Sequence, residues 1–195
     1  MIVLPRSRRA RMAAALGAAA LLAGGGVWWW LAGRSEPEPV AVPPEVCGGA
    51  LPAGRSVAAL LPAEGAPYAE RLTPDFTLPS GFWCGVTAGG VYLDFDYWRD
   101  VSSAYDEELA EQSRSPANAR IRRGTAHGYA NESKAVLFVD CPSPSSGREE
   151  TLKVQVQTRM HVVARGDRPV EEFERLVGDA ARYVAAQVGC APVEG

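Results

Sequence analysis

The clearest pattern along the chain is a strict alternation of apolar and polar residues in TLKVQVQTRMH, residues 151–161. One side of this segment carries Leu152, Val154, Val156, Thr158 and Met160. The other side carries Lys153, Gln155, Gln157, Arg159 and His161. A period of two predicts a β-strand with one covered face and one face in water, which is typical of an antiparallel sheet.

Four further apolar runs predict strands, and they fall into two pairs. The runs are residues 82–89, 90–98, 125–130 and 135–141. The first two meet at Gly89-Gly90, and a Gly-Gly pair between apolar runs favours a tight hairpin because both turn residues need positive φ angles. The other two are separated by the polar turn 131–134.

Three segments have the periodicity of helices. Residues 55–61 form a short amphipathic stretch that Pro62 ends, and Ser103 begins a second helix that runs to about residue 113. The apolar face of this second helix is thin, which predicts a position on the surface. The last helix begins near Pro169 and ends at Gly189. Its broad apolar stripe consists of Val170, Phe173, Leu176, Val177, Ala180, Tyr183 and Val184.

These elements together predict the fold class of the chain. We expect an α+β domain over residues 47–190, with about five mostly antiparallel strands and the long C-terminal helix packed on one face of the sheet. A short polar tail, residues 191–195, follows this domain.

A membrane-spanning helix is predicted ahead of this domain. Residues 12–33 contain no charge, and a helix of 22 residues spans about 33 Å, close to the thickness of a hydrocarbon core. The basic arm 1–11 carries four arginines, which favour the cytoplasmic side, and three tryptophans lie near the far end of the helix. We therefore expect a single-pass signal-anchor in the cell membrane, with the N-terminus cytoplasmic and the C-terminal domain extracellular.

The alternative for this segment is a cleaved signal peptide. Ala23 and Gly25 are small residues at spacing suitable for a signal peptidase. Cleavage there would leave Trp28, Trp29 and Trp30 exposed near the new N-terminus, so the uncleaved anchor is favoured. Residues 34–46 then form a linker rich in proline and glutamate, which predicts an extended spacer.

All four cysteines follow the predicted anchor, on its outward side. They are Cys47, Cys84, Cys141 and Cys190. An even number in an oxidising compartment predicts two disulfides, and three connectivities are possible. We favour Cys47–Cys84 and Cys141–Cys190, which would each fasten a helix to a strand. No pair has the spacing of a zinc site and neither histidine lies near a cysteine, so we expect no metal.

Charge limits the classes of partner. The chain as a whole has a net charge of −3, but residues after Arg34 carry 15 basic against 23 acidic side chains. Such an acidic domain is unsuited to nucleic acid, whose phosphates need neutralising. A local basic cluster, formed by Arg120, Arg122 and Arg123, is interpreted as a solvated loop.

Several short motifs resemble a known group of proteins. They are the arginine-rich start, the anchor, the acidic proline linker that leads into VCGGALP, a strand ending in DCP and a final helix closing on GC. In these features the chain resembles the single-pass or lipoprotein-like envelope proteins of actinomycetes, Streptomyces in particular. The resemblance implies an extracytoplasmic, disulfide-bonded α+β domain. It brings no catalytic residue, cofactor or substrate with it.

The search for chemistry gives one carboxylate pair and no nucleophile motif. There is no G-x-S-x-G, no S-x-x-K and no phosphate-binding glycine loop. His127 and His161 are interpreted as turn or surface histidines. Asp94 and Asp96 share one side of their strand, so they are either an acid–base pair or, as we favour, part of a solvated strand face opposite Lys153 or Arg159.

The hypothesis that we favour is a membrane-anchored extracytoplasmic binding domain of the bacterial envelope. It would act without catalysis, on an envelope protein or another ligand, and would need no cofactor. The candidate binding face consists of Asp94, Asp96, Lys153, Arg159 and His161. The alternatives are an envelope hydrolase that uses the Asp94/Asp96 pair, and a sensor whose anchor helix pairs through its glycines.

Overall fold

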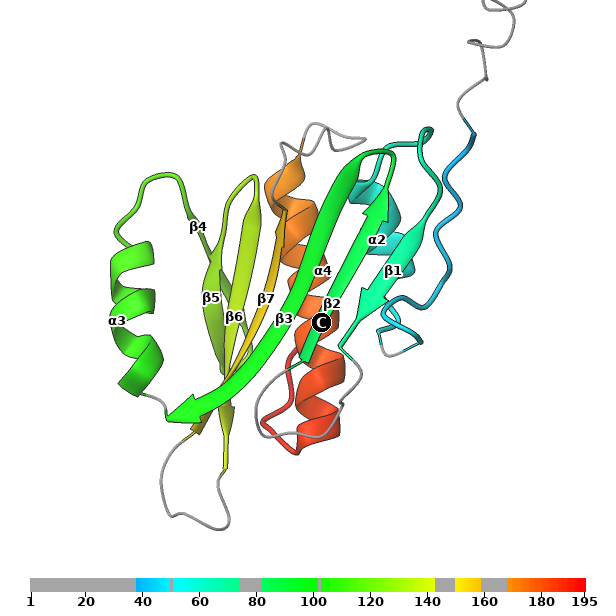
Figure 1. The fold of residues 1–195 in the computed structure, drawn as a ribbon. Coiled ribbons are helices and arrows are strands. Elements are labelled where there is room, and N and C mark those ends of the chain that lie inside the picture. Colours follow the sequence, from blue (N-terminus) through cyan, green and yellow to red (C-terminus); the bar gives the residue numbers. More distant parts are fainter. Residues whose placement is uncertain (1–37, 50, 74–81, 102, 143–149, 159–167) are drawn as a thin grey trace, which may run out of the picture. The chain divides into compact units, whose positions relative to one another are not determined.

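A computed structural model of the chain describes residues 38–49, 51–73, 82–101, 103–142, 150–158 and 168–195. The described residues form seven strands and three helices (Figure 1). The strands are β1 (Ala69–Leu72), β2 (Phe82–Ala88), β3 (Val91–Val101), β4 (Ala119–Arg123), β5 (Ala126–Ala130), β6 (Lys134–Cys141) and β7 (Glu150–Thr158). The helices are α2 (Gly54–Leu60), α3 (Ser103–Gln112) and α4 (Pro169–Val188).

All seven strands belong to one antiparallel sheet with the order β1-β2-β3-β7-β6-β5-β4. The α+β class, the antiparallel sheet and the C-terminal helix are therefore confirmed. The expected number of about five strands is wrong, because β1 and β4 were not predicted. Both lie at the edges of the sheet, and β4 contains the arginine cluster that we interpreted as a loop.

One face of the sheet holds the main hydrophobic core. The register places Cys84, Phe95, Val156 and Ala135 side by side across four strands on this face. Helix α4 covers it and buries Phe173, Leu176, Val177 and Val184, as the apolar stripe predicts. The helix ends as expected, since Gly189 has φ 72° and its N–H bonds to Ala185 O.

Helix α2 lies against α4 on the same side, and both disulfides fasten this layer. The Ser56 hydroxyl donates to Asp179 Oδ2 across the two helices at 2.9 Å. The bonds are Cys47–Cys84 and Cys141–Cys190, which confirms the pairing favoured from the sequence. One bond joins the segment before α2 to β2, and the other joins the end of β6 to the residue after the cap of α4.

The opposite face of the sheet, which we call the polar face, is covered in part by α3. Tyr105 and Leu109 of α3 pack against a second, smaller apolar cluster, which consists of Tyr129, Val136 and Phe138. The expectation that this face lies in water is wrong, since Gln155 is 6 % and Asp94 0 % exposed. The period of two gave the correct alternation but contained no sign of the helix that covers it.

No helix among the described residues is long and apolar enough to span a membrane. The helix predicted over residues 12–33 lies outside the described residues.

Candidate binding site on the polar face of the sheet

The register brings side chains from distant parts of the chain into two neighbouring rows on the polar face. The first row runs from β3 to β4 through Trp98, Lys153, Phe138, His127 and Arg122. The second row consists of Asp96, Gln155, Val136, Tyr129 and Arg120. Directly opposite residues of antiparallel strands point to the same face and interact. Each row therefore combines aromatic and charged groups.

Lys153 lies at the centre of three aromatic rings. Its Nζ is 5.3 Å from the ring centre of Trp98, 5.7 Å from that of Tyr105 and 5.9 Å from that of Phe138. The ammonium also donates to Glu108 Oε2 at 2.5 Å, and the lysine side chain is only 12 % exposed. Cation–π attraction and the ion pair together compensate for the removal of the charge from water.

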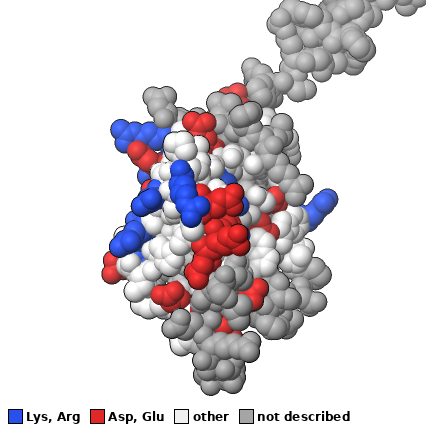
Figure 2. Space-filling view, turned by 90° about the vertical axis from the view of Figure 1, so that its left-hand side faces the viewer, with Lys and Arg blue, Asp and Glu red and all other residues white. Residues whose placement is uncertain are grey.

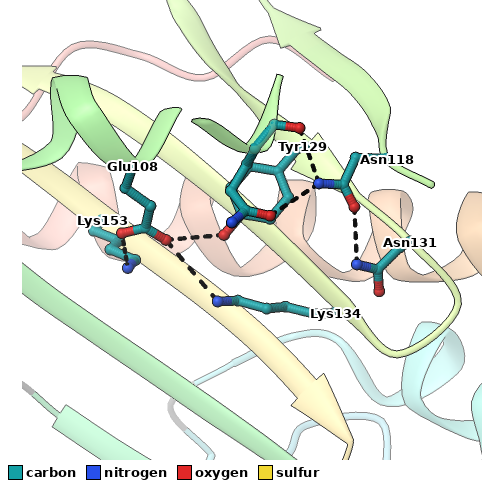
Figure 3. A network of polar contacts seen from close by, with 7 residues as sticks. Glu108, Asn118, Tyr129, Asn131, Lys134 and Lys153 are labelled. Carbon is teal, nitrogen blue, oxygen red and sulfur yellow. Dashed lines mark hydrogen bonds and ion pairs between the residues drawn. The ribbon is translucent and has the colours of Figure 1, made fainter. Parts of the chain in front are cut away.

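Glu108 connects α3 to three strands (Figure 3). Besides Lys153 on β7, it accepts from Tyr129 Oη on β5 at 2.8 Å and lies 3.9 Å from Lys134 Nζ on β6. Burial alone would raise the pKa of Glu108. Hydrogen bonds from Lys153 and Tyr129 and the charges of both lysines outweigh burial, so the pKa is lowered below its ordinary value.

The pKa values of Tyr129 and Lys134, two side chains that contact Glu108, are also shifted. Burial raises the pKa of Tyr129, and the hydrogen bond to Glu108 adds to the effect. Burial and the charge of Lys153 lower the pKa of Lys134, against the opposing effects of Glu108 and Asp96. Lys153, predicted to belong to an open binding face, is thus part of an internal contact that holds α3 on the sheet.

A second polar contact holds the C-terminal end of α3. Asn118, in the loop before β4, donates from Nδ2 to the backbone oxygen and Oε1 of Gln112, both at 3.0 Å. Its own Oδ1 accepts from Asn131 Nδ2 at 3.0 Å (Figure 3). The C-terminal end of the helix is therefore tied to the β5–β6 turn.

Asp94 and Asp96 lie on the polar face, as their spacing predicts, but their surroundings differ. Asp96 is half-buried, whereas Asp94 is fully buried and accepts from Trp83 Nε1 at 2.8 Å. Gly85, directly opposite Asp94, leaves room for two aromatic side chains. A Cβ atom there would stand 2.5 Å from Tyr92 Oη and 3.0 Å from the Trp83 ring. The interpretation of a solvated strand face is wrong for Asp94.

A pocket of about 210 Å³ opens between α3 and the sheet. Its lining consists of Tyr105, Asp106 and Leu109 from α3 and of His127, Phe138, Asp140 and Thr151 from β5, β6 and β7. Sequence reasoning missed this pocket, although the alternation in β6 places Phe138 and Asp140 on the same face. Helix α3 was predicted, but its position over this face was not, and its first turns form the second wall. His127, interpreted as a turn or surface histidine, is half-buried on β5, within the strand predicted over residues 125–130, and its Nδ1 lies 3.3 Å from Thr125 O.

The remaining predicted residues take other positions. Arg159 and His161 lie outside the described residues. Arg120 and Arg122 are exposed on β4, and Arg123 forms an ion pair with Glu174 of α4 at 3.2 Å. Within the described part of the chain no group of three or more His, Cys, Asp or Glu side chains is placed to hold a metal ion.

Exposed charges of both signs surround α3 and β4. Asp106, Glu107 and Glu111 are exposed on the helix, and Arg120 and Arg122 are exposed on β4. Figure 2 looks onto this side of the molecule and shows acidic and basic side chains next to each other. The surface around the pocket therefore combines both charges.

Comparison of the chain with protein-family models, curated proteins and solved structures finds no significant match.

Proposed function

We propose that the chain is a membrane-anchored binding domain of the bacterial envelope, which recognises a ligand outside the cytoplasm and acts without catalysis. The uncharged segment 12–33 and the basic arm before it support the anchor. Two disulfides support an oxidising compartment, where such bonds persist.

The main support for a binding role is the pocket between α3 and the polar face. Concave sites that combine apolar walls with a few convergent polar groups are the usual places of ligand binding. Here Leu109 and Phe138 provide apolar surface, and Asp106, His127 and Asp140 provide polar groups. Contacts in the middle and at the C-terminal end of α3 hold this wall of the pocket in place without a ligand, which reduces the entropic cost of binding.

The alternative of a hydrolase loses its main support. Paired carboxylates act as acid and base only when both reach the substrate. Asp94 is fully buried beneath aromatic side chains, and neither Asp94 nor Asp96 lines the pocket beside α3. A binding role needs no such access, so it is the function that we propose.

The test uses the full chain in detergent and a variant with a filled pocket. Small probes of four classes (amines, carboxylates, sugars and neutral aromatics) are measured by ligand-observed NMR. We expect at least one class to bind the wild type and to lose binding in His127→Trp, because the larger ring occupies the pocket. Thr87→Trp is the matched control, since Thr87 is half-buried on the same face but on β2.

Two results would contradict the proposal. One is that no class of probe binds the wild type. The other is that probes bind His127→Trp as well as they bind Thr87→Trp, which would put the binding site elsewhere.

A further inference from the structure

The charged side chains in the lining of the pocket beside α3 are acidic among the described residues. Its described lining includes the carboxylates of Asp106 and Asp140 and no lysine or arginine. A third carboxylate lies close by, because the register places Asp100, Thr151 and Asp140 side by side across β3, β7 and β6. Burial raises the pKa of Tyr105 to about 12, and the nearby charge of Asp100 contributes to this increase. Three acidic groups thus converge on this end of the polar face.

Aromatic rings form the other part of the wall. The ring centres of Tyr105 and Phe138 are 5.5 Å apart, and that of His127 is 6.2 Å from Phe138. The faces of aromatic rings attract cations, most strongly where water is partly excluded. Carboxylates next to such rings are the chemistry that recognises ammonium and guanidinium groups.

The molecule already uses two of these rings in this way. Tyr105 and Phe138 both lie within 6 Å of the Lys153 ammonium. This internal cation would repel a second one, but its charge is compensated by Glu108 at 2.5 Å. The N-terminus of α3 by itself would favour an anion, and Asp106 in its first turn opposes that effect.

The size of the pocket limits the ligand. A volume of about 210 Å³ is below the roughly 300–1,000 Å³ of pockets for drug-sized molecules. It suits one charged group on a short chain. On the basis of the proposed function, we propose that this pocket binds an organic cation, namely the ammonium or guanidinium group of a free amine or of a partner's lysine or arginine side chain.

The experiment compares probes of equal size and different charge. Butylamine and butylguanidine are titrated into the full chain in detergent, with butanol and butyrate as the neutral and anionic counterparts. All four titrations run in the same buffer at the same pH. We expect both cations to bind about tenfold more tightly than butanol or more, and butyrate to bind most weakly.

Variants locate the binding. Asp140→Asn and Asp106→Asn preserve side-chain size and remove one charge each, and we expect each to weaken cation binding by about three- to tenfold. Glu132→Gln is the matched control, since Glu132 is an exposed acid in the β5–β6 turn, outside the pocket lining. Cations that bind no better than butanol, or that bind the double variant Asp106→Asn/Asp140→Asn as well as the wild type, would overturn the inference.

Further probes distinguish a free amine from a partner's basic side chain. They also test the cation inference separately from the proposed binding function. Blocked tripeptides with a central lysine or arginine, compared with one containing norleucine, represent a partner's basic segment. Tighter binding of the basic peptides than of butylamine supports a protein partner, and the reverse order supports a free amine. If carboxylates or sugars bind instead, and His127→Trp abolishes that binding, the cation inference fails while the proposed function stands. If no probe binds, both fail.

Discussion

At the scale of single residues, Glu108 links α3 to the polar face of the sheet. Its carboxylate contacts Lys153, Tyr129 and Lys134 on three different strands. In Glu108→Gln, the Lys153 ammonium would lose its ion pair, and the Lys134 ammonium would keep only the weaker effect of Asp96. We expect a decrease of about 1–3 kcal/mol in the free energy of unfolding, measured by urea unfolding followed by circular dichroism.

The matched control for this change is Glu111→Gln. Glu111 is one turn further along α3 and is exposed, so its loss is expected to change the stability by less than about 0.5 kcal/mol. Equal effects of the two variants would show that the contacts of Glu108 contribute nothing specific to stability.

The stabilisation by Glu108 should also depend on pH with a defined sign. The pKa of Glu108 is lowered in the folded state below its ordinary value of 4.5. A carboxyl with a depressed folded pKa contributes stability above its unfolded pKa and loses it as the pH falls through the folded value. The difference in stability between wild type and Glu108→Gln should therefore be constant from pH 7 to about pH 5 and decrease below about pH 4.5. A difference that grows on acidification would contradict this assignment.

Single residues also show why part of the site was unpredictable from sequence. The alternation in β3 and β7 placed Asp94, Gln155 and Lys153 on the correct face. Whether a polar residue on that face is wet depends on what covers it, and the cover comes from α3 and from Trp83 and Tyr92. Such long-range contacts leave no periodic signal in the covered strand.

At the scale of secondary-structure elements, the close approach of β5 and β6 requires Gly128. A Cβ atom at this position would stand 1.9 Å from the backbone oxygen of Val136, so the strands would have to separate. We expect Gly128→Ala to decrease the free energy of unfolding by about 1–3 kcal/mol through this overpacking.

Gly178 provides the contrasting control, because it lies inside α4 and is also buried. The nearest heavy atom to a Cβ at this site is Arg123 Nε at 3.9 Å, an ordinary contact distance. Gly178→Ala should therefore stabilise the protein by about 0.5–1 kcal/mol through helix propensity. Urea unfolding of both variants checks the pair, and destabilisation of the same size by both would contradict the argument.

Elements differ in how well the sequence predicts them. Helix α4 and the strands β2, β3, β6 and β7 carry long periodic patterns, and the structure contains all of them near the predicted bounds. The missed strands lie at the sheet edges and are short. β1 reads AERL, without apolar alternation, and β4 reads ARIRR, in which only Ile121 is buried. Edge strands form by pairing with a neighbour, and charged residues there hinder further pairing.

At the scale of the whole molecule, the seven-stranded sheet and both disulfides lie in the part of the chain after residue 37. The prediction that this domain is tethered to a membrane rests on a different part of the chain, the uncharged segment 12–33. The competing interpretation, cleavage after Gly25, predicts a different product. The intact mass of the mature protein therefore separates the two interpretations.

We expect the mature protein to retain residues 1–25, as its intact mass would show, and to sediment with membranes after a high-salt wash. Leu21→Arg/Leu22→Arg should release it, because each arginine near the centre of a membrane helix costs about 2.5–3.5 kcal/mol. Ser35→Arg, just after the segment, is the control and should leave sedimentation unchanged. A mass that corresponds to residues 26–195, together with a soluble product, would replace the anchor with a secreted domain. The pocket beside α3, whose described lining lies within residues 105–151, would then act in a freely diffusing protein.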